Sequence, residues 1–375
     1  MPKIKVPLFD LKVTDQNLKL DLMNAFSNML DHGKFFMGPE IDEFESNLSE
    51  IFKTKYVVGL GSGSSALYIA LKASGIEIGD EVITTPLSWI ITGNAILACG
   101  ATPVFADVLD DFNIDPESIK KLITKKTKAI VPMHYAGHMC KMDVLQKIAN
   151  DNNLLIIEDA AQSFGAQLKG KRSGTFSSIG AFSLNPMKTF GALGEAGFVI
   201  TENYEAYEKI KMFRHAGTKQ VPKSIITNDC HEVSLNHKMD TINATALNIF
   251  LKYFDQKFLM RQKIAKIFDD ELKHIVELQG YLEDEIHGRY VYPVKVKQRN
   301  NLKAYLQEHS IETKVFNIPL VCDAPIYSNI KKTDVKNARR ILDESIVIPS
   351  HEKLSEIQIN YVIDKIKDFY KRGVK

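Results

Sequence analysis

The sequence predicts an α/β fold, and three observations support this prediction. Between residues 56 and 159, short apolar runs typical of buried strands alternate with segments of helical spacing. These segments are long enough to serve as crossovers, which join parallel strands. From Ser177 the pattern changes to consecutive strand-like runs, one long helix and a mixed end. We therefore expect a large, mostly parallel sheet domain over residues 1–245 and a smaller α+β domain over residues 246–375.

The large domain should begin with two helices, followed by the strands of its sheet. Leu22, Phe26 and Met29 recur at helical spacing and predict a helix over residues 18–30. Gly33 and the Gly38-Pro39 pair end it. The later segments follow from alternating apolar runs and turn residues: helix 41–52, strand 56–60, helix 66–73, strand 81–85, a helix ending near residue 100, strand 103–108, helix 115–123, strand 128–135, helix 144–150 and strand 154–159.

The second half of the chain has a different order of elements. Runs 179–184 and 197–201 are consecutive strand-like segments joined by a loop that contains Lys188. A long helix is expected over residues 241–275, and the small domain should then alternate strand 289–296, helix 301–310, strand 313–316 and helix 356–369. The polar loop from Gly217 to Cys230 is a candidate mobile flap.

Composition excludes several classes of function. The 48 basic and 46 acidic side chains leave a net charge of +2, which does not favour a nucleic-acid or membrane partner. The amino-terminal residues lack the apolar run of a signal peptide, and no window predicts a membrane span, so we expect a cytoplasmic protein. The four cysteines are far apart, which predicts reduced thiols and no zinc site: Cys99, Cys140, Cys230 and Cys322.

Lys188 and Asp159 suggest one chemistry. Asp159 ends an apolar strand, and Lys188 follows in a turn rich in small residues, where its amine can point into a cleft. Pyridoxal phosphate is anchored by a lysine imine and needs a carboxylate beside its ring nitrogen. The alternative is that Lys188 is a surface lysine and Asp159 caps a helix.

The stretch Gly61 to Ala66 fits the G-x-G-x-x-A pattern between a strand and a helix. A dinucleotide site would also need an acidic residue at the carboxyl end of the next strand, whereas Glu81 lies at the start of that strand. The turn can still hold a phosphate, because its backbone N–H groups and the helix amino terminus attract anions. A nicotinamide-dependent dehydrogenase and a helix cap without ligand remain alternatives.

Trp89 is the single tryptophan, and it follows the strand at residues 81–85. It is expected at the sheet edge that carries the phosphate turn. A lone tryptophan commonly belongs to a core, but at this edge its indole could stack on a pyridine ring.

Taken together, these segments resemble the DegT/DnrJ/EryC1/StrS family of PLP-dependent sugar aminotransferases, which have the aspartate-aminotransferase type of fold. The resemblance covers nearly the whole chain and is carried by VPLFDLK, HGKFFMGPEIDEFE, SGSSALYIAL, IEDAAQSFGA, FSLNPMKTFGALGEAG and IPSHEKLSEIQINYVIDKI. It implies that Lys188 forms the internal aldimine with pyridoxal phosphate and that Asp159 faces the pyridine nitrogen. It also implies that Gln162 lies next to the phenolic oxygen and that Trp89 stacks on the ring.

The resemblance implies a phosphate site formed by Gly63, Ser64 and Ser183, together with Asn236 from the neighbouring subunit of a homodimer with shared active sites. From the residues alone, Asn236 could instead cap the helix that follows it. The chain departs from the family at a few positions: Ser62, Met187, Ala196 and Lys238 replace the usual residues, and the segment KVFNIPLVCDAPIY lacks a histidine expected there.

The sequence thus predicts an aminotransferase that moves an amino group, from glutamate by family analogy, to a nucleotide-linked keto-deoxy sugar. No metal is expected. A non-catalytic protein that retains the fold is a further alternative, although Asp159, Gln162 and Lys188 together argue for retained chemistry.

Overall fold

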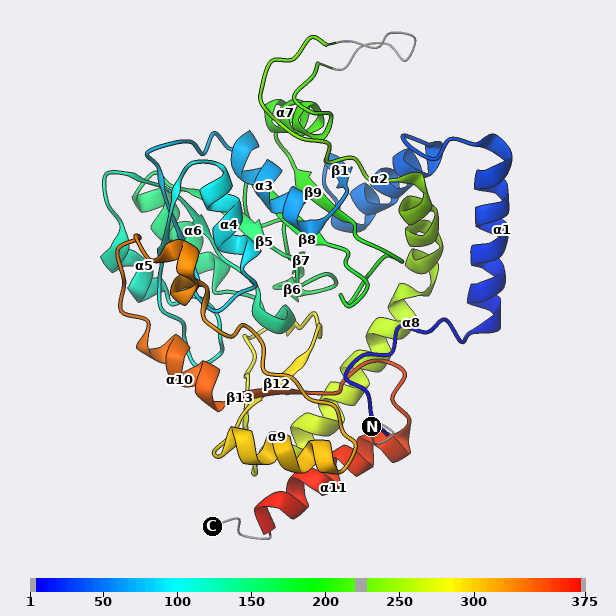
Figure 1. Ribbon diagram of the computed structural model, residues 1–375, viewed down its shortest axis with the longest axis vertical. Helices are drawn as coiled ribbons and strands as arrows, with labels where there is room; N and C mark the ends of the chain where they lie inside the picture. The colour runs from blue at the N-terminus through cyan, green and yellow to red at the C-terminus, as the bar shows by residue number, and fades with distance from the viewer. Residues whose placement is uncertain (1–4, 220–227, 372–375) are drawn as a thin grey trace.

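A computed structural model describes residues 5–219 and 228–371 of the chain, and Figure 1 shows its arrangement. Its centre is a seven-stranded sheet in the order β1-β9-β8-β5-β4-β2-β3. Only β9 runs antiparallel to its neighbours, and the other strands are parallel, so the α/β prediction is confirmed. The strands are β1 (Tyr56–Leu60), β2 (Glu81–Thr84), β3 (Thr102–Phe105), β4 (Thr127–Val131), β5 (Leu155–Asp159), β8 (Ile179–Ser183) and β9 (Gly197–Thr201).

Helices cover both faces of this sheet, because successive side chains of a strand point to opposite faces. Ala181 and Val199 pack against α3 (Gly63–Ala73), α4 (Ile91–Ala98) and α7 (Tyr204–Arg214). Their neighbours Phe182 and Phe198 pack against α1 (Gln16–His32), α2 (Pro39–Phe52) and the long helix α8 (Thr241–Leu272). On that same face, α5 (Pro116–Leu122) and α6 (Met142–Asp151) cover Ile83 and Ile130.

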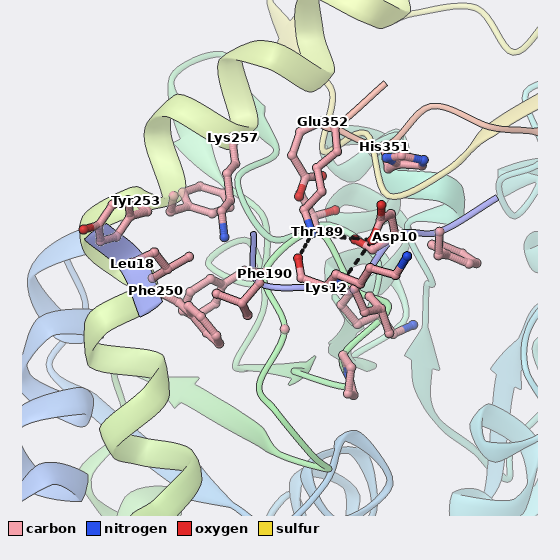
Figure 2. Close-up of a pocket in the computed structure, with 18 of the residues that line it drawn as sticks. Asp10, Lys12, Leu18, Thr189, Phe190, Phe250, Tyr253, Lys257, His351 and Glu352 are labelled. Atoms are coloured by element: carbon pink, nitrogen blue, oxygen red, sulfur yellow. Dashed lines mark hydrogen bonds and ion pairs between the residues drawn. The ribbon is translucent and has the colours of Figure 1, made fainter. Parts of the chain in front are cut away.

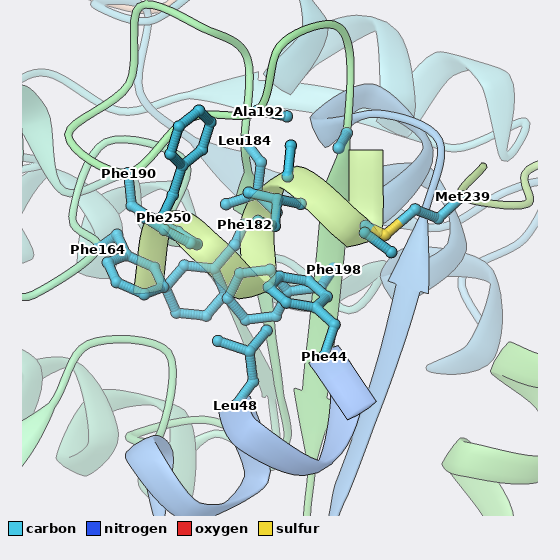
Figure 3. Close-up of a cluster of buried hydrophobic side chains, with 14 of the residues drawn as sticks. Phe44, Leu48, Phe164, Phe182, Leu184, Phe190, Ala192, Phe198, Met239 and Phe250 are labelled. Atoms are coloured by element: carbon cyan, nitrogen blue, oxygen red, sulfur yellow. The ribbon is translucent and has the colours of Figure 1, made fainter. Parts of the chain in front are cut away.

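Aromatic side chains fill the core below α8 (Figure 3). The rings of Phe182 and Phe198 are stacked with centroids 4.4 Å apart, and Phe164 meets Phe254 edge to face at 4.9 Å. Such aromatic pairs stabilise the core by more than the free energy gained from burying their surface area. They support the strand end at Ser183, from which the loop of Lys188 begins.

Helix α8 connects two cores. Its first half contributes Leu247 and Phe250 to the core of the large sheet, and its second half contributes Ile264 and Phe268 to a second core. That second core surrounds a three-stranded sheet in the order β10-β12-β13, and it also buries Val6 of the amino-terminal arm. The predicted division at residues 245 and 246 falls inside α8 and stays a prediction.

The small domain differs from its predicted order. Residues 313–316 are not a strand, since Lys314 forms only an isolated bridge to Val347. The third strand is β13, which the sequence reading missed together with α10. The elements of this part are β10 (Glu277–Leu278), β12 (Tyr292–Lys295), α9 (Arg299–Glu308), α10 (Lys336–Glu344), β13 (Ser345–Ile348) and α11 (Glu356–Lys371), with short 3-10 turns at Val321–Asp323 and Pro325–Tyr327.

A third, small sheet joins the two halves of the chain. The strand β11 (Glu285–Ile286) pairs with β6 (Gln167–Leu168), which pairs with β7 (Lys171–Arg172). Residues 220–227 of the predicted mobile loop lie outside the described residues. Within the described ranges, none of the helices combines the length and apolar character needed to cross a bilayer.

Candidate active site

The predicted site residues gather at the carboxyl edge of the parallel strands. Gly61 follows β1, Asp159 ends β5 and Ser183 ends β8. Parallel strands bring their carboxyl ends to one edge, where open α/β sheets bind ligands. The topology therefore places the phosphate turn, the acid and the lysine loop side by side.

Asp159 is buried, with 3% of its surface exposed. Its Oδ2 accepts a hydrogen bond of 2.8 Å from Thr92 Oγ1, and its Oδ1 accepts one of 3.2 Å from the backbone N–H of Ala161. Ser88 Oγ lies 2.7 Å from Thr92 Oγ1 and extends this buried chain of hydroxyl groups. Burial raises the pKa of Asp159, while Thr92, Ala161 and Lys188 oppose that rise.

Thr92 and Ser88 were missed by the sequence reading. Thr92 is 67 positions away from Asp159 in the chain, so no local pattern links the two residues. The structure also contradicts the alternative that Asp159 acts only as a helix cap. Its side chain accepts from Ala161 in a turn, and no helix among the described residues begins there.

The loop from Asn185 to Gly194 has a defined shape. Asn185 Oδ1 accepts from the backbone N–H of Met187, and the carbonyl of Asn185 accepts from that of Lys188. This asparagine turn is a usual way to reverse a chain. A Cβ on Gly191 would lie 2.6 Å from the carbonyl oxygen of Asn185, so only glycine fits there. Gly194 donates its N–H to Asn243 Oδ1 of α8 at 3.1 Å, which ties the loop to the long helix.

The amine of Lys188 lies 4.4 Å from the ring centroid of Tyr290. Burial lowers the pKa of Lys188 to about 8, although the charges of Asp159 and Glu195 act in the opposite direction. The next residue, Thr189, donates its hydroxyl to the carbonyl of Gly288 at 3.1 Å. The segment before β12 therefore provides both the aromatic surface beneath the amine and an anchor for its loop. Lys188 is not a freely solvated surface lysine.

The phosphate turn begins a helix one turn earlier than predicted. Helix α3 starts at Gly63, and Ser62 caps it by accepting from the N–H of Ser65 at 3.0 Å. A Cβ on Gly63 would come within 2.5 Å of Ser183 Cβ, so the end of β8 packs directly on the first turn of α3. Ser64 is exposed beside this contact. The structure thus brings Gly63, Ser64 and Ser183 together at a helix amino terminus, where an anion is favoured.

Gln162 is held by the backbone of another loop. Its Oε1 accepts from the N–H of Ala136 at 2.8 Å. Because the amide oxygen faces that donor, the amide nitrogen is the end that remains to donate elsewhere. Ala136 has a positive φ of 58° and lies in the 3-10 turn Tyr135–Gly137, which packs against Gly288.

Trp89 and Asn236 lie on the surface of the chain. Trp89 is 66% exposed, directly before α4. Asn236 is exposed, and its Oδ1 accepts from the N–H of Lys238 at 3.2 Å. Asn236 does not cap the following helix, because the cap of α8 is Asp240. Its segment runs beside the phosphate turn of its own chain, where Gly61 donates its N–H to the carbonyl of His237.

A cavity of about 450 Å³ lies between the amino-terminal arm, the lysine loop and α8. Figure 2 shows Lys257 and His351 at opposite sides of this cavity, with Thr189 between them. His351 is 4% exposed, and burial lowers its pKa. Lys188 also lines this cavity, so a polar ligand bound there would meet both side chains.

The sheet order contradicts the dinucleotide alternative. In a dinucleotide fold, the strand after the glycine turn carries its acid at the carboxyl end near the turn. Here β1 lies at one end of the sheet beside β9, whereas β2 lies between β4 and β3. Glu81 begins β2 and accepts a hydrogen bond from Thr124 at the opposite edge. The nicotinamide hypothesis is therefore wrong.

Comparison with known proteins agrees with this geometry. Residues 16–367 match the DegT/DnrJ/EryC1/StrS aminotransferase family. The chain belongs to this family. A pleiotropic regulatory protein of Geobacillus stearothermophilus is 33% identical, covering 98% of this chain and 99% of the relative. A dTDP-3-amino-3,4,6-trideoxy-alpha-D-glucose transaminase of Streptomyces venezuelae is 31% identical, and the match covers 98% of this chain and 97% of that relative.

Among solved structures, NtdA of Bacillus subtilis with its cofactor PMP bound superposes with a TM-score of 0.87. It is 29% identical, and the match covers 99% of this chain and 86% of that one. The DegT/DnrJ/EryC1/StrS protein described here is an aminotransferase that uses pyridoxal phosphate. Its residues fit the cofactor phosphate, because the amino terminus of α3 begins at Gly63 beside the exposed Ser64, and the close packing of Gly63 on Ser183 brings a second hydroxyl to that terminus.

Proposed function

We propose that the protein transfers an amino group from glutamate to a nucleotide-linked keto-deoxy sugar, and that Lys188 is the residue that binds the cofactor covalently. The observation that carries this proposal is the environment of Lys188. Its amine is held over Tyr290 and has a pKa lowered to about 8, so a useful fraction is unprotonated near neutral pH.

Pyridoxal phosphate supplies an electron sink for the carbon atom that loses a proton. In our proposal, the amine of Lys188 would act as a general base that accepts the proton from the donor carbon and then returns it to the carbon of the acceptor, because its pKa of about 8 is close to neutral pH. Asp159 would keep the ring nitrogen of the cofactor protonated, since Thr92 and Ala161 hold its carboxylate at the end of β5. Burial raises the pKa of Asp159, and a positive charge beside its carboxylate would lower that pKa again.

The other predicted residues would bind and orient the cofactor. Gly63, Ser64 and Ser183 would hold the phosphate at the amino terminus of α3. Gln162 would donate its amide nitrogen toward the phenolic oxygen, since its amide oxygen already accepts from Ala136. Trp89 would cover the ring.

A sugar acceptor is supported by the transaminase of Streptomyces venezuelae, whose name specifies a dTDP-linked amino sugar. The cavity beside Lys188 is suited to a polar substrate, because it combines apolar side chains with His351 and Lys257. Glutamate as donor follows from family analogy.

The test is a panel of nucleotide-linked keto sugars incubated with the protein and ¹⁵N-glutamate, followed by mass spectrometry of the sugars. We expect ¹⁵N in one class of keto sugar with wild-type protein and none with Lys188→Ala. If ¹⁵N exchanges between glutamate and keto acids but does not reach any sugar, the protein is still an aminotransferase and the proposed sugar acceptor is wrong.

A further inference from the structure

A second cavity, of about 480 Å³, lies at the opposite edge of the large sheet. Thr54 precedes β1, Ser177 precedes β8 and Thr201 ends the antiparallel β9, so this is the amino edge of the parallel strands. Five-residue strands at about 3.3 Å per residue separate the two edges by roughly 15 Å. The cavity is therefore distinct from the active site.

The walls of this cavity carry an excess of positive charge. Its cations are Lys53, Lys169, Lys171 and Arg172, whereas Glu202 is its one acidic side chain. Glu202 is paired with Lys55 outside the cavity at 3.6 Å, and Lys169 lies 3.6 Å from Asp143. Both pairs are largely exposed, and exposed pairs of this kind contribute little. The cavity thus keeps a surplus of cations.

Arg172 is the best defined of these cations. It is half-buried in β7, and its guanidinium forms no hydrogen bond or ion pair with any described residue. Burial lowers the pKa of Arg172, and the charge of Asp255 opposes this. Lys171 extends its amine over the ring of Phe176 at 4.7 Å. Although the charge of Asp255 acts on it, this half-buried guanidinium retains hydrogen-bond donors that can bind an anion.

One loop of the cavity wall is held by hydrogen bonds to a buried carboxylate. Glu158 is completely buried and accepts hydrogen bonds of 2.7 Å from the N–H groups of Gly174 and Phe176, and of 2.9 Å from Ser177 Oγ. These bonds fix the loop that contributes Gly174, Thr175 and Ser177 to the cavity. Sites for small molecules are usually preformed in this way.

We propose that this cavity binds an organic phosphate of the size of a nucleotide or a sugar phosphate. The fork of guanidinium donors matches phosphate oxygens, and the lysines add point charges around it. The cavity is larger than a phosphate group alone requires, and Gln167 and Thr175 line the remainder with polar groups suited to hydroxyls. The proposal does not depend on the identity of the transaminase substrates.

The experiment uses the pyridoxal phosphate-saturated protein, so that its cofactor phosphate site is filled. Calorimetry measures binding of UDP, of glucose 1-phosphate and, as an uncharged control, of uridine. Amine labelling with mass spectrometry then locates the ligand, since a phosphate in this cavity should protect Lys169 and Lys171. The two phosphates distinguish a nucleotide from a sugar phosphate as the ligand.

We expect Arg172→Gln and Lys53→Gln each to weaken binding of the protecting phosphate by about tenfold, the usual effect of removing a charge-assisted hydrogen bond. Lys120→Gln is the control, because this exposed lysine pairs with Glu117 and neither residue lines the cavity. Transamination by all three variants should be unchanged. The proposal is rejected if neither phosphate protects Lys169 and Lys171, if uridine protects them equally, or if Lys120→Gln weakens binding as much as Arg172→Gln.

Discussion

Lys188 and Asp159 influence each other through burial and charge. Burial favours the neutral form of each group, whereas their opposite charges favour the ionised forms. The balance leaves Lys188 with a pKa of about 8, far below that of a solvated lysine. Roles of this kind are testable by single substitutions that preserve the surrounding packing.

Lys188→Ala should abolish transamination and the visible absorbance of the lysine-bound cofactor, because no other amine is held over Tyr290 among the described residues. The far-UV circular dichroism spectrum should be unchanged. Lys120→Ala, at an exposed lysine paired with Glu117, is the control and should keep full activity. A yellow, borohydride-reducible Lys188→Ala protein would assign the attachment to another residue.

Asp159→Asn should slow transamination by roughly a hundredfold or more, the usual cost of removing a preorganised electrostatic partner. Its effect on Lys188 can be measured without turnover. In cofactor-free wild-type protein, amine labelling of Lys188 should be half-maximal near pH 8. Since the Asp159 charge raises the Lys188 pKa, the asparagine variant should reach half-maximal labelling at a lower pH. An unchanged labelling profile and near-normal turnover would limit Asp159 to a structural role.

At the scale of elements, the start of α3 depends on its contact with β8. Gly63→Ala would bring a methyl group within 2.5 Å of Ser183 Cβ, so the helix terminus must shift. Overpacking of this kind costs about 1–3 kcal/mol. We expect cofactor affinity, measured by fluorescence titration, to fall by about tenfold. Ser64→Ala, which removes one exposed hydroxyl, should lower cofactor affinity less. A larger loss of affinity in Ser64→Ala than in Gly63→Ala would show that the packing of α3 on β8 does not determine cofactor affinity.

The segment around β11 is held to the large domain by a buried ion pair. His138 Nδ1 lies 2.8 Å from a Glu285 carboxylate oxygen, and its Nε2 lies 3.6 Å from Asp111 Oδ2. The ring also stacks on His287, whose pKa burial lowers. Although burial of His138 opposes protonation, Asp111 and Glu285 raise its pKa to about 9.

A raised histidine pKa stabilises the fold fully below pH 6.5, and this contribution is lost as pH rises toward 9. The free energy of unfolding should therefore fall by about 3 kcal/mol across this window in wild-type protein. In Glu285→Gln the decline should be shallower, because only Asp111 then favours the protonated ring. Denaturant melts at pH 6 and pH 9 provide the measurement. If the free energy of unfolding falls equally in the two proteins, the His138–Glu285 pair is not the cause of the pH dependence.

At the scale of the whole molecule, we predict a homodimer in which Asn236 of one subunit reaches the phosphate site of the other. Asn236 is exposed and does not cap α8, so its side chain is accessible to a partner. Exposed apolar side chains nearby, Phe36 and Leu235, are suited to an interface between copies of the chain.

Subunit mixing tests this arrangement. Inactive Lys188→Ala subunits are combined with inactive Asn236→Trp subunits, and the mixed dimers are isolated. One site of each mixed dimer then joins an intact Lys188 to an intact Asn236 from its partner, so activity should return to about half per dimer. Mixed dimers without activity would place Asn236 outside the partner's site.

Some features of this protein were readable from the sequence alone. Buried parallel strands are apolar throughout and alternate with helices, so the α/β class and most elements of the large domain were predicted. The sequence singled out Asp159, Lys188 and the turn at Gly63 as candidates, because each lies at or shortly after a strand end marked by glycine or small residues. These are local patterns that neighbouring residues determine.

The tertiary structure decided what depends on contacts between distant segments. Helix α7 was missed because only Ile210, Phe213 and the stem of Arg214 are buried along it, which is too narrow a stripe to identify. Residues 313–316 do not form the third strand of the small sheet. That place belongs to β13, which forms a continuous ladder with β12. Thr92 and Tyr290 join Asp159 and Lys188 only after the strands and the two domains have come together. Sequence periodicity reports the burial of a segment, but the choice of partner depends on packing across the whole fold.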